Sequence, residues 1–186
     1  RRISEAMEDC PEILRPINYQ QSCPGKGYVV IKVKNGIRLL VLNAAGQIYM
    51  DPADSPFAAV DKIISTVEHD ISVADFHAEA TSEKIAYGYH FDGRVNIIVG
   101  THTHVQTNDA RVLSNGTMYM TDLGMTGALD GVIGVEKEGI IKKFLTGMPV
   151  RHNPMEKGLK QFCGLVVDID EKSRKVTKYD IINMVE

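Results

Sequence analysis

The chain has 186 residues, of which 44% are hydrophobic and 24% charged, with a formal net charge of −3. This composition is that of an ordinary globular protein, and the charge gives no reason to expect a surface for duplex nucleic acid. No apolar stretch approaches the roughly 20 residues that span a bilayer, so a membrane partner is not expected either. Cys10, Cys23 and Cys163 are odd in number and widely spaced, which indicates a reducing, cytoplasmic location.

The first third of the sequence predicts a short helix followed by a hairpin. The chain starts Arg-Arg-Ile-Ser with no initiator methionine, and residues 2–9 have helical spacing, so we expect a fragment or a processed product of a longer protein. Residues 13–27 are rich in Pro and Gly and predict an irregular segment. Residues 28–34 and 37–43 are β-rich, and the Asn-Gly between them predicts a tight hairpin.

The middle of the chain alternates helices and strands. After a loop over 44–56, residues 56–68 place their apolar side chains on one helical face. Residues 71–76 predict a strand that ends at His77, residues 81–87 a helix, and residues 95–99 an apolar strand.

The last third predicts a strand over 117–121, a glycine-rich loop over 124–134 and a helix over 136–145. Residues 162–169 and 175–182 predict a second hairpin. Alternating strands and helices indicate an α/β layered fold, and the two hairpins indicate that its sheets are mixed. No repeat or linker divides the chain, so we expect one domain over residues 1–186.

Three of the six histidines follow two of the predicted strands. His77 ends the strand at 71–76, and His102 and His104 follow the strand at 95–99 within Gly-Thr-His-Thr-His. Ligands of α/β sheets bind beyond the carboxyl ends of the strands. If these strands are neighbours, three imidazoles line one cleft, and His102 and His104 point the same way if the segment is extended. This arrangement predicts a metal site.

Histidines alone add no negative charge, and a two-metal hydrolase needs a bridging carboxylate. The candidates are Asp75, Glu79 and Asp122, but each suits equally well a helix cap or a partner that orients a histidine ring. The loop over 124–134 could cradle a phosphate through its amides, although a tight-turning loop is the simpler interpretation. No Ser-His-Asp or Cys-His arrangement can be placed, so no catalytic residue is assigned.

Several segments together resemble the YmdB-like bacterial metallophosphoesterases. They are Asp-Phe-His-Ala-Glu-Ala-Thr-Ser-Glu-Lys at 75–84, Gly-Thr-His-Thr-His-Val-Gln-Thr at 100–107 and Thr-Asp-Leu-Gly-Met-Thr-Gly at 121–127. Leu-Arg-Pro-Ile-Asn at 14–18 and Pro-Gly-Lys-Gly at 24–27 also fit, and the resemblance runs nearly from end to end.

The resemblance implies a calcineurin-like α/β sandwich of mixed sheets flanked by helices, with two divalent metal ions, iron or manganese. It implies hydrolysis of small phosphodiesters such as cyclic nucleotides through metal-activated water. By the same resemblance, His77 and His102 would bind one cation and His104 its neighbour.

The sequence departs from that family at its start. The family's N-terminal Gly-Asp, Asn-Gly-Glu-Asn and Gly-Asn-His motifs, which supply carboxylate ligands and a general-acid histidine, are not found here. We therefore expect a fold incomplete at its N-terminus, carrying only the histidine half of the site. The isolated chain should have little activity and weak metal affinity, and its uncovered faces should favour a homo-oligomer or packing against more of the same protein.

Two other functions fit the same residues. One is an inactive module that binds phosphate or a metal, for which we expect binding without turnover. The other is a mononuclear three-histidine hydrolase in which Glu79 acts as base, for which we expect one tightly bound metal and activity in this chain alone.

Overall fold

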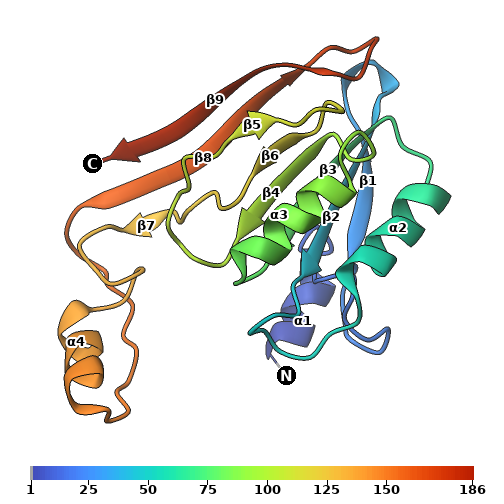
Figure 1. Ribbon diagram of the computed structural model, residues 1–186. Helices are drawn as coiled ribbons and strands as arrows, with labels where there is room; N and C mark the ends of the chain where they lie inside the picture. Colours follow the sequence, from blue (N-terminus) through green and yellow to red (C-terminus); the bar gives the residue numbers. More distant parts are fainter. Residues whose placement is uncertain (1) are drawn as a thin grey trace.

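The computed structural model describes residues 2–186, whose strands form a six-stranded and a three-stranded sheet (Figure 1). The larger sheet has the order β1-β2-β3-β4-β6-β5. Its inner strands are parallel, and the two edge strands pair antiparallel with their neighbours. In sheet order the strands are β1 (Tyr28–Lys32), β2 (Arg38–Ala45), β3 (Ile71–His77), β4 (Ile97–Thr101), β6 (Met118–Met120) and β5 (Arg111–Val112).

Helices α2 (Pro56–Thr66) and α3 (Thr81–His90) cover one face of this sheet (Figure 1). Alternate residues of β2 and β3 point into that layer and are buried, as the two-residue period of a strand requires. The aromatic ring of Phe76 stacks on that of Tyr87, with centroids 4.0 Å apart. This core fixes β3 and the start of α3 relative to each other.

The smaller sheet consists of β7 (Gly127–Ala128), β8 (Lys160–Ile169) and β9 (Val176–Val185), all antiparallel. Side chains join the β8–β9 hairpin to the rest of the molecule. Gln106 Nε2 donates to Ile182 O at 3.0 Å, and Tyr179 Oη donates to Ala110 O at 3.0 Å. α1 (Arg2–Asp9) lies near the N-terminus, whereas α4 (Lys137–Thr146) projects away from the larger sheet (Figure 1).

The predicted α/β fold, with a mixed sheet flanked by helices, is confirmed. The first hairpin differs in detail: a short 3-10 helix η1 (Lys34–Gly36) replaces the two-residue turn, and Asn35 adopts a φ of 64°. The strand predicted at 95–99 lies at 97–101, which puts His102 directly after it. None of the helices in residues 2–186 has the length and apolar character needed to cross a membrane.

Candidate metal centre

The sheet brings two of the three predicted histidines together. β3 and β4 are parallel neighbours, and their register pairs His77 with Thr101. His102 is the next residue, so both imidazoles lie at the carboxyl edge of the sheet, where α/β proteins bind ligands. His102 Nδ1 lies 3.1 Å from His77 Nε2, and the two rings meet edge to face at 82°.

The outer nitrogen of His77 is held by a chain of hydrogen bonds. Its Nδ1 lies 3.0 Å from Thr101 Oγ1, and that hydroxyl donates to Asp75 Oδ1 at 2.8 Å. The second oxygen of Asp75 accepts from Asn43 Nδ2 at 2.7 Å. Because the Thr101 proton points at the carboxylate, the hydroxyl oxygen accepts from His77 Nδ1–H. His77 Nε2 therefore carries a free lone pair.

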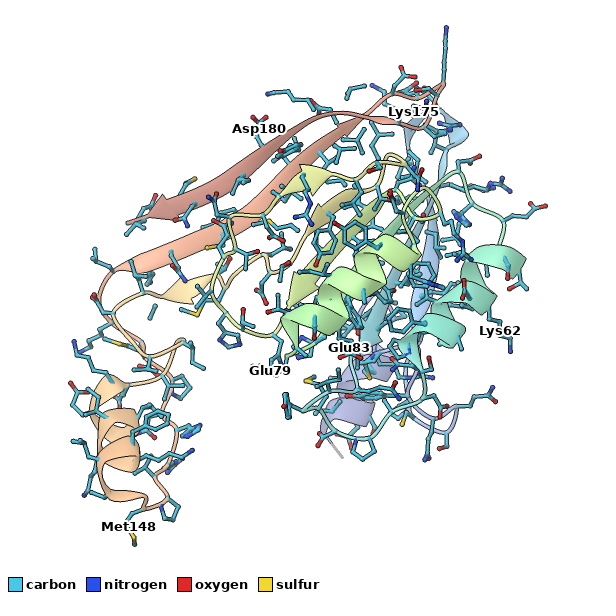
Figure 2. The ribbon with its side chains drawn as sticks, in the orientation of Figure 1. Lys62, Glu79, Glu83, Met148, Lys175 and Asp180 are labelled. Atoms are coloured by element: carbon cyan, nitrogen blue, oxygen red, sulfur yellow. The ribbon has the colours of Figure 1, made fainter. Side chains whose placement is uncertain are left out.

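The outer nitrogen of His102 faces a carboxylate as well. His102 Nε2 lies 3.0 Å from Glu79 Oε2, and Glu79 stands just before α3 (Figure 2). When His102 Nε2–H donates to Glu79, Nδ1 carries a lone pair that faces His77 Nε2. A carboxylate or hydroxyl acceptor behind each ring is the usual arrangement around metal-binding histidines.

The separation of the two inner nitrogens fits a shared cation. Ligand nitrogens about 2.1 Å from one ion, at angles of roughly 95–109°, lie about 3.1–3.4 Å apart. The observed separation is 3.1 Å, a distance that also suits a hydrogen bond between the two rings. The pKa of His77 is lowered from its usual value, first by burial and then by the neighbouring His102. His77 is consequently neutral near pH 7, which is the form that binds metals.

The side chain of His104 does not join the His77–His102 pair. His102 and His104 have φ angles of 113° and 66°, so the segment turns and is not the extended chain that the sequence predicts. His104 Nδ1 lies 3.0 Å from Ile133 O in the glycine-rich loop. Within residues 2–186 the structure shows no group of three or more His, Cys, Asp or Glu side chains placed to hold one metal ion. His77 Nε2 and His102 Nδ1 thus form a partial donor set of two nitrogens, and Glu79 stands behind His102 at its outer nitrogen.

A buried ion pair holds the loop that carries His102. Lys84 Nζ lies 2.8 Å from Asp122 Oδ2 and also donates to Thr101 O at 2.8 Å. The same Asp122 oxygen accepts from Thr103 N at 3.0 Å. Lys84 and Asp122 together therefore hold the backbone on either side of His102, Lys84 at Thr101 O and Asp122 at Thr103 N. A side chain at Gly100 would place Cβ 1.8 Å from Thr121 O, so only glycine fits there.

Thr101, Asn43 and Lys84 are not among the site residues predicted from the sequence. Nothing near Thr101 or Asn43 in the sequence points to Asp75, because these contacts join residues 26 and 32 positions apart. Lys84 did have a signal, since it shares a helical stripe with the buried residues Tyr87 and Gly88. A lysine in an apolar stripe predicts a buried partner of opposite charge.

The chain matches a known protein family along nearly its whole length. The profile of the family described as "YmdB-like protein" matches residues 1–182. The chain is 44% identical over 184 residues to a Bacillus subtilis protein named 2′,3′-cyclic-nucleotide 2′-phosphodiesterase, covering 98% of this chain and 69% of that protein. It is 35% identical over 181 residues to a Mycoplasma genitalium protein named as a candidate phosphatase/phosphodiesterase, covering 94% and 64%.

Two solved structures have the same fold. A hypothetical protein from Thermus thermophilus superposes with a TM-score of 0.93 at 36% identity, covering 100% of this chain and 72% of that one. A structure described as a novel phosphatase from Mycoplasma pneumoniae superposes with a TM-score of 0.87 at 34% identity, covering 92% and 63%. The chain therefore spans about two thirds of the length of these proteins.

Proposed function

Since this chain belongs to the YmdB-like family, we propose that it is part of a metal-dependent phosphodiesterase. The substrate class we propose is a small phosphodiester such as a cyclic nucleotide, in keeping with the name of the Bacillus subtilis relative. The observation that carries the proposal is the His77–His102 pair, whose inner nitrogens face each other while both outer nitrogens have acceptors.

In this proposal His77 and His102 hold one divalent cation and His104 a second, with iron or manganese as the candidate metals. Cations held there would supply positive charge that favours attack of water on phosphorus. The other side chains have supporting roles. Thr101 and Asp75 keep His77 in the tautomer with a free Nε2, and Glu79 does the same for Nδ1 of His102.

We further propose that this chain supplies only the histidine half of the site and that the carboxylate ligands lie outside the 186 residues. The partial donor set of residues 2–186 supports this reading. A cytoplasmic location belongs to the same proposal, because each of the three cysteines is free.

Self-association is also part of the proposal. Several apolar side chains of α4 face outward, including Ile141 and Leu145. An exposed apolar patch of this kind is typical of an interaction surface, and a second copy of the chain would cover it. Light scattering of the purified chain tests this point, and a monomeric mass at high concentration would contradict it.

The test of function compares metal content and hydrolysis for the 186-residue chain and for the longest product of its gene. We expect the longer protein to hydrolyse 2′,3′-cyclic AMP with Mn²⁺. We expect His77→Ala or His102→Ala to lower kcat by at least about 100-fold, because loss of an outer partner of a metal ligand alone costs about 10- to 100-fold. His152→Ala, in an exposed loop, is the matched control.

Equal turnover by the two histidine variants and the wild type would contradict the proposal. Binding of Mn²⁺ or phosphate without turnover in the longer protein would instead favour the inactive binding module. Full activity of the short chain, with one tightly bound metal, would favour the mononuclear hydrolase.

A further inference from the structure

A hollow beside the histidine pair has an aromatic lining. Its volume is about 320 Å³, and Tyr19, Tyr49, Asp51, His77 and His102 lie on its wall. This volume is in the range of small-molecule sites, about 300–1,000 Å³. Any phosphate bound at the two histidines would therefore have the rest of its molecule next to two tyrosines.

The loop that carries Tyr49 is fixed at both ends. Buried Glu83, in the first turn of α3 (Figure 2), accepts from Gln47 N at 2.9 Å and from Ile48 N at 3.2 Å. Asn18, also buried, donates through Nδ2 to Ala45 O and to Asp54 O, both at 2.8 Å. The ends of the loop are thus anchored by buried polar groups, and its tip is held next to the histidines.

Tyr49 has a backbone conformation that is energetically unfavourable for a tyrosine. Its φ is 60°, in the left-handed region that favours glycine or asparagine. It is 88% exposed, so packing within the protein does not offset that cost. Strained residues that the surrounding structure holds in place cluster at ligand sites.

We infer that this hollow receives the base of a nucleotide substrate and that the Tyr49 ring is the surface on which the base stacks. The inference rests on the proposed function, because it takes the phosphate to lie at His77 and His102. A flat aromatic face suits any base, since every base has a π-face. The polar wall at Asp51 then lies at the edge of the base.

The experiment measures binding, so it does not depend on turnover. Calorimetry with Mn²⁺ on the longest product of the gene compares 3′-AMP, which has no cyclic ester to hydrolyse, with base-free ribose 3-phosphate. We expect Tyr49→Leu to weaken 3′-AMP binding roughly 5- to 150-fold, the range that loss of one base–aromatic stack gives. Ribose 3-phosphate should bind Tyr49→Leu and wild type alike.

Tyr49→Phe is the matched control, since it keeps the ring and should bind 3′-AMP within about twofold of wild type. Equal losses for 3′-AMP and ribose 3-phosphate, or no loss for either, would overturn the inference. So would a wild-type protein that binds 3′-AMP no more tightly than ribose 3-phosphate. Hydrolysis of 2′,3′-cyclic AMP, measured in parallel, reports separately on the proposed function.

Discussion

Lys84 and Asp122 carry opposite charges inside the protein, with 1% of each side chain exposed. The free energy lost when two charges leave water is about as large as the free energy gained from their attraction. Such a pair therefore adds little net stability. Its bonds to Thr101 O and Thr103 N are more informative, because these groups flank His102. The pair therefore sets the backbone from which His102 reaches His77.

We predict that Lys84→Met strongly destabilises the protein. The substitution keeps the length of the side chain but leaves the Asp122 carboxylate buried without its cation, which typically costs about 3–5 kcal/mol. Chemical denaturation measures the change in the free energy of unfolding. Lys62→Met, on the exposed side of α2 (Figure 2), is the matched control and should change it by less than about 0.5 kcal/mol.

The double variant Lys84→Met with Asp122→Asn separates charge from packing. Asparagine keeps an acceptor for Thr103 N without a buried charge, so the double variant should recover part of the lost stability. A double variant as unstable as the sum of the two single variants would show that the charge of Asp122 is not the cause.

Acid should unfold the protein partly through Asp122. Burial alone would raise the pKa of Asp122, but the Lys84 ammonium and the amides of Thr103 and Gly124 hold that pKa below its usual value. A carboxyl with a lowered folded pKa stabilises the fold above the unfolded pKa, about 3.9, and this contribution is lost as the pH falls through the folded pKa.

We therefore expect the melting temperature of the wild type to fall between about pH 4 and pH 2, and the fall to be shallower in Asp122→Asn. Thermal melts in this pH range provide the measurement. Asp180→Asn, on the exposed β9 (Figure 2), should keep the wild-type slope. An unchanged slope in Asp122→Asn would show that other carboxyls account for acid unfolding.

At the scale of single residues, the sequence predicts residue types better than partners. His77 and His102 are identified because they end predicted strands, and this edge is where the structure places them. The sequence alone does not distinguish the roles of the three candidate carboxylates, Asp75, Glu79 and Asp122. Their roles depend on contacts between distant segments, such as Lys84 with Asp122, which local spacing does not encode.

At the scale of the elements, α4 differs from the helices of the sheet layer because it buries so little apolar side-chain surface. Ile140 is buried, whereas Phe144 and Leu145 are 81% and 80% exposed. A helix of 10 residues is only marginally stable in isolation, so it depends on packing its apolar face against another part of the protein or against a partner. The local stability of α4 should therefore be lower than that of α3, whose rings lie in the core.

We predict that Phe144→Ser with Leu145→Ser lowers the apparent mass of a self-associated chain in light scattering, while far-ultraviolet circular dichroism remains the same. The reason is that these two side chains contribute exposed apolar surface and little packing. Ser65→Ala, on exposed α2, is the control and should leave the mass unchanged. An unchanged mass in the double variant would exclude α4 from the contact.

Elements with strong periodicity are predictable here and very short ones are not. The helix at α2 follows from its apolar stripe, and the β8–β9 hairpin follows from its two β-rich runs. β5 and β7 have two residues each, too few to show any period. The turn at His102 was missed because its positive φ occurs at a residue other than glycine.

At the scale of the whole molecule, the site lies where the larger sheet, the start of α3 and the anchored loop after β2 meet. A ligand that binds only the folded state raises its stability by RT ln(1 + [L]/Kd). Binding of a cation at the histidine pair should therefore be visible as a change in the melting of the entire chain.

We predict that Mn²⁺ raises the melting temperature of the wild type and that a chelator reverses the effect. For a weak site with a Kd of about 100 μM, 1 mM Mn²⁺ adds roughly 1.4 kcal/mol. Differential scanning fluorimetry provides the measurement. His77→Ala and His102→Ala should lose the shift, whereas His152→Ala should keep it, and a shift that survives in all three variants would place the metal elsewhere.

The positive φ angles at Tyr49, His102 and His104 have a consequence for directed evolution. Glycine or asparagine would relieve the backbone at each position, so a library selected only for heat resistance should enrich these two residues there. Such clones would gain thermal tolerance but lose the side chains that we propose contact the ligand. Ile133 and Arg174 also have positive φ angles, so enrichment of glycine or asparagine at those two positions as well would identify backbone relief as the cause.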